Sequence, residues 1–227
     1  YSHGYPSSQD IVQEKVMNVN GNGAFSCFIF GAGYDILSAI VCTKTAAYTF
    51  LQEETDMRDG FIRTAAATPK IKVADPFHNR EAVCNIIEEY EKKGVELLVF
   101  PELCLSGYTC NDLFLQEVLL EQVKEELKNL VDFTKGRRML VFAGLPWEHE
   151  GKLYNVAAAI CDGTLLGLVT KTNMPNYSEF YELRHFTPGM EIPVLTDWLD
   201  TRVPMGTNLL FTCKENPKLT VAAEICE

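Results

Sequence analysis

The sequence predicts an α/β domain in which helices cover one face of a mixed β-sheet. Two segments early in the domain, residues 78–94 and 115–136, have the apolar spacing of amphipathic helices. Two later segments, residues 154–170 and 209–223, each contain a pair of apolar runs separated by turn-forming residues, which is typical of hairpins. Helices that precede hairpins in this way indicate a mixed sheet with helices on one face.

The first 56 residues do not share this pattern. Residues 1–22 are polar and rich in turn-forming residues, and residues 24–42 are mostly apolar. The apolar run is long enough for a transmembrane helix, but two glycines and an aspartate interrupt it and no basic cluster flanks it. We therefore predict that residues 1–56 are an extension of unknown role outside the domain. The domain is expected to start at Met57 and to span residues 57–227.

The first predicted helix lies between two short predicted strands, residues 61–67 and 96–100. Its apolar residues recur every three or four positions, as they do on the buried side of a helix. Asn79 is the predicted N-cap, and Gly94 stands where a glycine commonly follows the end of a helix.

The second predicted helix is followed by a predicted buried strand, residues 139–143, and Gly136 marks the end of the helix. Its apolar face is expected to consist of Leu115, Val118, Leu119, Gln122, Leu127, Leu130 and Val131. The two predicted hairpins complete the domain, the first of them around the turn at residues 161–164.

Composition excludes some classes of partner. The chain has 227 residues, of which 47% are apolar, enough for a sizeable core. Its net charge of -11 argues against nucleic acid and against an anionic membrane as partners. The eight cysteines form no C-x-x-C pair and no Cys/His cluster with the spacing of a metal site. Because no secretory signal is visible, we expect reduced thiols and a cytoplasmic protein.

Three potentially reactive side chains each follow a predicted buried strand. They are Glu102, Lys171 and Cys226. If their strands are neighbours in one sheet, the three side chains meet at the same rim of that sheet. Each residue also has an ordinary explanation, because most lone cysteines are small buried hydrophobic residues and a Glu or Lys after a strand usually lies on the surface. Only their joint occurrence favours a site.

A thiol, a carboxylate and an ammonium group together can hydrolyse an amide. The thiolate is the nucleophile, and the carboxylate of Glu102 can accept the thiol proton. The ammonium group of Lys171, aided by a backbone N–H beside the nucleophile, can stabilise the oxyanion of the tetrahedral intermediate. The carboxylate then serves as the acid for the leaving amine and as the base for the hydrolytic water.

Three blocks of the sequence resemble the nitrilase, or carbon–nitrogen hydrolase, superfamily. Residues 101–108, PELCLSGY, look like its P-E-L-x-x-[ST]-G-Y block. Residues 171–182, KTNMPNYSEFYE, resemble its lysine block, and residues 224–227, EICE, resemble its cysteine block. The resemblance covers the chain from about Arg58 to Glu227.

Within this superfamily, three segments are similar to the amidohydrolase domain of glutamine-dependent NAD synthetases of the bacterial type: residues 57–61, 108–115 and 176–182. The resemblance implies a nitrilase-like α-β-β-α sandwich, incomplete at its C-terminus. It also implies a glutaminase that passes ammonia through a tunnel to an ATP-dependent domain, which amidates nicotinic acid adenine dinucleotide to NAD. ATP and magnesium are expected at that further domain, with no cofactor or metal in this portion.

By the same resemblance, Glu102 is the general base, Lys171 the oxyanion lysine and Cys226 the nucleophile. Glu179 is expected to be the supporting glutamate that orients the lysine and the base. The residues expected to line the glutamine pocket are Tyr108, Tyr177, Phe180 and Glu227. Ordinary core or lid packing explains the two aromatic residues at 177 and 180 equally well.

Two other functions remain open from the sequence: a stand-alone nitrilase-type amidase for another small amide, and a binding module with a vestigial triad. The resemblance also suggests a homo-oligomer. The sequence contains no S-G-G-x-D-S pyrophosphate loop and ends one residue after Cys226. We therefore expect residues 1–227 alone to fold poorly, with exposed sheet edges, and to hydrolyse little glutamine.

Overall fold

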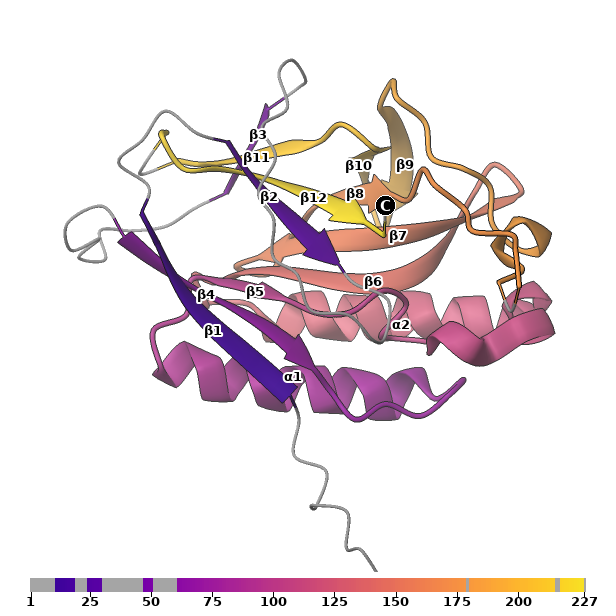
Figure 1. Cartoon of the computed structure of the whole chain (residues 1–227), viewed down its shortest axis with the longest axis horizontal. Coiled ribbons are helices and arrows are strands. Elements are labelled where there is room, and N and C mark those ends of the chain that lie inside the picture. The colour runs from indigo at the N-terminus through magenta and orange to yellow at the C-terminus, as the bar shows by residue number, and fades with distance from the viewer. Residues whose placement is uncertain are drawn as a thin grey trace, which may run out of the picture.

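The structure, a computed structural model, consists of two facing β-sheets with two long helices against the larger sheet (Figure 1). It describes residues 11–18, 24–29, 47–50, 61–178, 180–214 and 217–226, the first three ranges by their backbone alone. Within these ranges, no helix has the length and apolar character needed to cross a membrane.

The larger sheet has the strand order β1-β4-β5-β6-β7-β8-β10-β9 among the described residues. Its strands are β1 (Ile11–Asn18), β4 (Phe61–Thr68), β5 (Leu97–Val99), β6 (Leu140–His149), β7 (Lys152–Cys161), β8 (Thr164–Thr170), β9 (Val194–Trp198) and β10 (Thr201–Gly206). Strands β4 to β6 are parallel, whereas β6, β7 and β8 alternate in direction. The sheet is therefore mixed, as predicted. Strands β5 and β8 run in the same direction, so their C-terminal ends point to the same rim.

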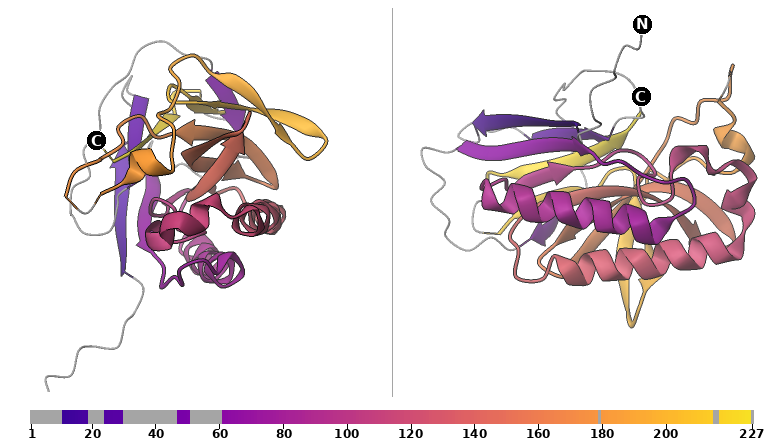
Figure 2. Two further views of the ribbon diagram at one scale, coloured as in Figure 1. Left: turned by 90° about the vertical axis from the view of Figure 1, so that its right-hand side faces the viewer. Right: turned by 90° about the horizontal axis from the view of Figure 1, so that it is seen from below.

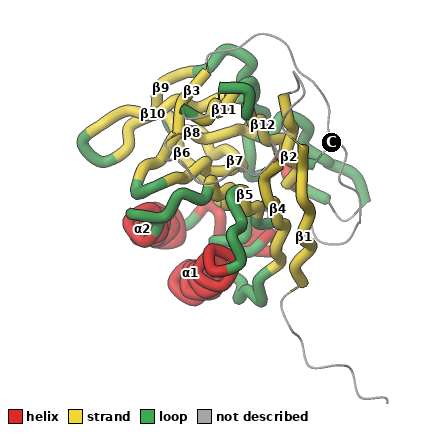
Figure 3. The backbone as a smooth tube through the Cα atoms, turned by 90° about the vertical axis from the view of Figure 1, so that its left-hand side faces the viewer, coloured by secondary structure: helices red, strands yellow, loops and turns green. Residues whose placement is uncertain are grey.

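The smaller sheet has the order β2-β12-β11-β3. Its strands are β2 (Ala24–Ile29), β3 (Ala47–Phe50), β11 (Leu210–Cys213) and β12 (Thr220–Ile225). Strands β11 and β12 are antiparallel neighbours, which confirms the second predicted hairpin, and β7 with β8 confirms the first. Figure 3 shows this sheet beside the larger one, and β12 contacts β7 and β8 across the gap between the two sheets.

Two long helices, α1 (Pro76–Lys92) and α2 (Glu117–Phe133), lie side by side on one face of the larger sheet (Figure 2). Two short 3₁₀ segments, η2 (Tyr108–Leu115) and η3 (Glu182–Arg184), lie in the loops after β5 and β8. The prediction of helices on one face is confirmed. The described residues thus form three layers, α-β-β, of the nitrilase-like sandwich.

The predicted N-cap of the first helix is wrong. Asp75 caps α1 by accepting the N–H of His78 at 3.0 Å, and Pro76 occupies the first turn, where a missing N–H costs nothing. Asn79 is instead fully buried, and its side chain bonds to both backbone groups of Lys72 and to the carbonyl of Leu105. It therefore fastens the loop before α1 to the loop after β5.

The predicted apolar face of the second helix is wrong at its N-terminal end. Leu115 and Val118 are 61% and 65% exposed, and Gln122 is exposed too. The buried face begins at Leu119 and continues through Val123. Leu115 belongs to η2 and precedes α2, which starts at Glu117. Within α2, the buried side is formed by Leu119 and the residues that follow at helical spacing, and Val118 lies beside it, facing solvent.

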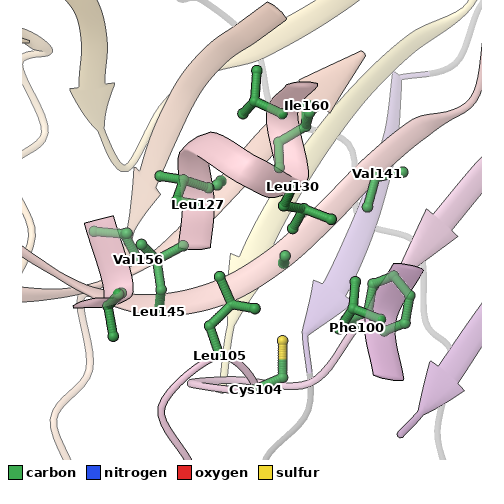
Figure 4. Packing of buried hydrophobic residues seen from close by; sticks show 14 of the residues in the cluster. Phe100, Cys104, Leu105, Leu127, Leu130, Val141, Leu145, Val156 and Ile160 are labelled. Carbon is green, nitrogen blue, oxygen red and sulfur yellow. The ribbon is translucent and has the colours of Figure 1, made fainter. Parts of the chain in front are cut away.

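Strand β6 divides the core because its side chains alternate between two hydrophobic clusters. Val141, Ala143 and Leu145 face the helices, whereas Leu140 and Phe142 face the smaller sheet. Figure 4 shows the helix-side cluster, including Leu127 and Leu130 of α2 against β6 and β7 and Leu105 of the loop after β5. Both faces of the central strands are buried, which is why these strands are almost continuously apolar.

That residues 1–56 stand outside the domain stays a prediction, and Met57 lies outside the described residues. The three described strands of this stretch do pair with strands of the domain. Strand β1 is antiparallel to β4, and β2 and β3 are parallel to β12 and β11.

Candidate active site

Glu102 lies in a tight loop that follows β5. Backbone hydrogen bonds fasten the loop, among them those from Leu105 to Gly144 at 3.1 Å, from Gly107 to Leu103 at 2.7 Å and from Ala74 to Ser106 at 2.7 Å. Because of these contacts, the glutamate is held on a fixed support and is only 5% exposed.

Gly144 of β6 allows this loop to lie directly on the sheet. A Cβ atom at position 144 would lie 2.5 Å from the carbonyl oxygen of Pro101 and 2.8 Å from the carbonyl carbon of Glu102. No side chain larger than hydrogen fits there without moving the loop. Gly144 was not predicted from the sequence, although a glycine inside an apolar strand is a known sign of close backbone approach.

Lys171 follows β8 and is 1% exposed. Its backbone N–H donates to the carbonyl of Asn155 at 2.9 Å, and its own carbonyl accepts the N–H of Gly189 at 2.7 Å. These bonds continue the pairing of the strand past its end and direct the side chain inward, toward the loop that carries Glu102.

The ammonium group of Lys171 lies between two carboxylates. It donates to Oε1 of Glu102 at 2.6 Å and to Oε1 of Glu182 at 2.8 Å. Glu182 is 5% exposed, and the hydroxyl of Tyr108 donates to its Oε1 at 2.6 Å. A buried charge is tolerated when it is paired and hydrogen-bonded in this way.

Glu182 was not predicted from the sequence as a site residue. Glu179, the predicted supporting glutamate, lies outside the described residues, so its role stays a prediction. The two glutamates lie three positions apart in a polar segment, and no local pattern distinguishes them. A second residue that was missed is Asn155, a fully buried amide in β7 that donates to Oε1 of Glu102. A polar residue inside a strongly apolar strand was the available signal for Asn155.

Cys226 reaches the site from the other sheet. It follows β12 of the smaller sheet, so the condition expected from the sequence, that the three strands are neighbours in one sheet, is not met. Burial raises the pKa of its thiol. Of the charged groups around the thiol, Lys171 lowers this pKa, and Glu102 and Glu182 raise it. Its φ of 44° is in the left-handed region, a strained conformation for a residue with a side chain that is concentrated at functional sites.

The other described cysteines are unlike Cys226. Cys84, Cys104, Cys110, Cys161 and Cys213 are buried. Burial raises the pKa of Cys104 to about 12 and that of Cys84 to about 11, so both remain inert thiols at neutral pH. Cys226 is only partly buried and is therefore the accessible thiol at this rim.

Burial governs the protonation of the site. It raises the pKa of Glu102, while Lys171 and Asn155 act in the opposite direction and Glu182 adds to the increase. Burial alone would lower the pKa of Lys171, but Glu102 and Glu182 outweigh it and the pKa is raised. Burial also raises the pKa of Cys226. The result is a permanent cation beside a carboxylate that binds a proton more readily than usual and a thiol that needs a base.

The residues expected to line a glutamine pocket fall into three groups. Tyr108 is half-buried, and its hydroxyl donates a hydrogen bond to Glu182. Tyr177 is 67% exposed and its ring lies 5.6 Å from that of the half-buried Phe180. Glu227 lies outside the described residues. Their role in binding glutamine stays a prediction.

Sequence comparison places these features in a family context. The family model described as carbon-nitrogen hydrolase matches residues 63–227. The chain is 36% identical over 168 residues to a glutamine-dependent NAD(+) synthetase of Mycobacterium leprae, an alignment that covers 74% of this chain and 25% of that protein. It is 39% identical over 119 residues to the synthetase of the same name from Aquifex aeolicus, over 52% of this chain and 21% of that protein.

Structural comparison agrees. The crystal structure of a glutamine-dependent NAD(+) synthetase from Cytophaga hutchinsonii matches with a TM-score of 0.64 and 29% identity, over 68% of this chain and 26% of that chain. The chain thus spans about a quarter of the length of the relatives that it matches.

Proposed function

Because the chain belongs to the carbon–nitrogen hydrolase family, we propose that it hydrolyses the side-chain amide of glutamine through a thioester on Cys226. The observation that carries the proposal is the approach of a thiol from one sheet to a buried Glu102–Lys171 pair of the other. The choice of glutamine rests on the names of the relatives, which are glutamine-dependent synthetases.

The proposed reaction begins with transfer of the thiol proton of Cys226 to Glu102. The sulfur then attacks the amide carbon, and the carbonyl oxygen becomes an oxyanion. Glu102 returns the proton to the leaving nitrogen, and ammonia departs as the thioester forms. A water molecule then gives a proton to Glu102 as its oxygen attacks the thioester carbon; the C–S bond breaks, Glu102 returns the proton to the sulfur, and glutamate and the free thiol are released.

Lys171 is suited to the oxyanion. An ammonium group has three N–H donors. One is directed to Glu102 and one to Glu182, whose two oxygens both lie 2.8 Å from the nitrogen, and the third can turn to the substrate oxygen. The two carboxylates hold the cation in place before the negative charge develops, and such preorganisation is the main source of electrostatic stabilisation of a transition state.

We further propose that the complete protein uses this ammonia to amidate nicotinic acid adenine dinucleotide to NAD, with ATP and magnesium bound outside these 227 residues. The support is the similarity to synthetases about four times as long. Within the described residues, no group of three or more His, Cys, Asp or Glu side chains has the arrangement of a metal site.

The test replaces Cys226 with alanine in the complete protein. NAD formation with glutamine as nitrogen donor is expected to fall by at least about 1,000-fold, because no thioester can form, whereas formation with ammonium chloride is expected to be unchanged. NAD formation measured with each donor decides the matter. Equal loss with both donors would contradict the proposal, and a wild-type protein that releases ammonia from another amide but forms no NAD would indicate a stand-alone amidase.

A further inference from the structure

Asn155 is a polar side chain in the most apolar part of the larger sheet. It lies in β7, paired with Pro146, and is fully buried. Its neighbours Tyr154 and Val156 face the helices, so the alternation of the strand directs Asn155 to the opposite face, where β12 packs. Ala157, the next residue on that face, is a small apolar residue of the intersheet core.

Two contacts connect Asn155 to the proposed catalytic residues. Its side-chain amide donates to Oε1 of Glu102, and its backbone carbonyl accepts the N–H of Lys171 at 2.9 Å. Lys171 donates to the same Oε1 of Glu102 at 2.6 Å. Both hydrogen bonds described for the Glu102 carboxylate therefore go to one of its two oxygens.

We propose that Asn155 is a positioning residue that, together with Lys171, occupies Oε1 of Glu102 and leaves Oε2 as the oxygen that exchanges protons with Cys226. This inference rests on the proposed role of Glu102 as general base. The side-chain amide of Asn155 and the ammonium group of Lys171 both donate to Oε1 of Glu102. This oxygen is therefore not free to accept a further proton. The carboxylate is thereby held in one orientation, and the proton travels through one defined atom.

The contacts of Asn155 argue against a merely structural role. Its Oδ1 is buried and has no hydrogen-bond partner among the described residues. A buried, unsatisfied carbonyl oxygen weakens a fold, and an apolar side chain of similar size would avoid that cost. The amide is therefore better explained by what its N–H group does for Glu102 than by what it contributes to the core.

The test compares Asn155→Leu and Asn155→Asp with wild type in the complete protein. The readout is the pH dependence of Cys226 alkylation by iodoacetamide, followed by mass spectrometry, together with the pH dependence of kcat/KM for glutamine. Both variants lose the donor that favours ionised Glu102, and the aspartate adds a nearby negative charge. The acidic limb of both pH profiles is therefore expected to shift to higher pH, by about one unit or more. The kcat for glutamine is expected to be about 10- to 100-fold lower than in wild type.

Thr134→Val is the matched control. Thr134 is a buried polar residue whose hydroxyl donates to the carbonyl of Val131 and accepts the N–H of Gly163, away from the site. It is expected to affect stability and to leave the acidic limb in place. Should Asn155→Leu fold poorly, Asn155→Asp has the shape of the native side chain and still removes the donor.

A Glu102→Gln background separates positioning from a general loss of structure. There, Asn155→Leu is expected to cause no further change in the rate of Cys226 alkylation, because the carboxylate on which it acts is gone. The inference is overturned if the acidic limb stays where it is in both Asn155 variants, or if the two substitutions reduce the alkylation rate independently. If the limb moves in alkylation while wild type hydrolyses no glutamine, the proposed function fails and the role of Asn155 stands.

Discussion

Lys171 is the residue on which the charge of the site depends. Its ammonium group is in contact with two carboxylates, and all three side chains are at least 95% buried. Removing one member of a buried ion pair is costly because the remaining charge has neither water nor a partner. The same argument explains why Glu102 and Lys171 have to be considered together rather than as separate catalytic groups.

Lys171→Met is therefore expected to lower the free energy of unfolding by about 3–5 kcal/mol at pH 8. Burial raises the pKa of Glu102 in the folded protein, and the variant loses the cation that opposes this increase. A raised folded-state pKa gives stability that is present at low pH and is lost as the pH rises through that value. The loss should thus be smaller at pH 5 than at pH 8, as measured by urea unfolding.

Lys92→Met is the control for this prediction. Lys92 pairs with Glu88 on the exposed side of α1, where solvent screens the interaction. It is expected to show little change at either pH. A Lys171→Met variant that is as stable as wild type at pH 8 would contradict the view that the cation holds two buried carboxylates.

At the scale of elements, the site depends on loops that are fastened to one another and to the sheet. Segments η2 and η3 are far apart in the sequence, but Asp112 of η2 accepts two hydrogen bonds from Arg184, at 2.8 and 3.0 Å, and one contact of 3.1 Å from His185. The Tyr108–Glu182 hydrogen bond joins the same two segments. The contacts of Asp112 therefore help to keep Glu182 beside Lys171.

Asp112→Asn is expected to increase amide hydrogen exchange of residues 180–186 without unfolding the domain, because the charged fork to Arg184 is lost.

Hydrogen bonds from Arg184 and His185 lower the pKa of Asp112 to about 2. A depressed pKa gives stability above the unfolded value, about 3.9, that is lost as the pH falls through the folded one. Because this ion pair is exposed and screened by solvent, its contribution to the protection of the segment is small, and in wild type it is expected to be lost only below the pH at which an ordinary aspartate titrates.

Asp197→Asn, which removes an exposed contact to Arg202 on the β9–β10 hairpin, is the matched control and should leave residues 180–186 unchanged. Equal exchange in wild type and Asp112→Asn would show that the fork does not hold η3.

The close approach of β6 to the Glu102 loop gives a second prediction at this scale. Gly144→Ala is expected to displace the loop, to lower kcat for glutamine hydrolysis by about 100-fold and to destabilise the protein by about 1–3 kcal/mol. Gly167→Ala is the control. Its Cβ would contact Leu209 and Pro204 at 3.1 Å, away from the loop, so it should affect stability more than activity.

At the scale of the whole molecule, the two halves of the site are held by different sheets. Glu102 and Lys171 follow strands of the larger sheet, and Cys226 follows a strand of the smaller one. The packing between the sheets therefore sets the distance between base and nucleophile. Phe211 of β11 is fully buried in this layer, and its ring lies edge-on to that of Phe142 with 5.6 Å between centroids.

Phe211→Ala is expected to destabilise the protein by about 3–5 kcal/mol, because it removes a large side chain and leaves a cavity between the sheets. The exposed Val118→Ala should have little effect. Chemical unfolding measures both. Alkylation of Cys226 at a denaturant concentration below the transition provides a second readout, and Phe211→Ala should alter its rate if intersheet packing positions the nucleophile.

Most elements could be predicted from the sequence because their signals are local. The helix that ends before Gly94, the hairpin around residues 161–164 and the buried strands before Glu102 and Lys171 all follow from apolar spacing and turn residues. Details that depend on neighbours could not be predicted in this way. Asn79 looked like a cap because the sequence does not show that Asp75 takes this role and that Leu105 lies beside Asn79.

By itself, the sequence determined two helices, two hairpins, a mixed sheet with helices on one face, and the residue types that follow three of the strands; strands β9 and β10 were not predicted. Only the tertiary structure decided that Cys226 comes from the second sheet, that Glu182 contacts Lys171, and that Asn155 donates to Glu102. Periodicity and turn chemistry act over a few residues and leave a local record in the chain. Contacts between residues 11 to 69 positions apart depend on how the sheets and loops pack, and no local pattern encodes that packing.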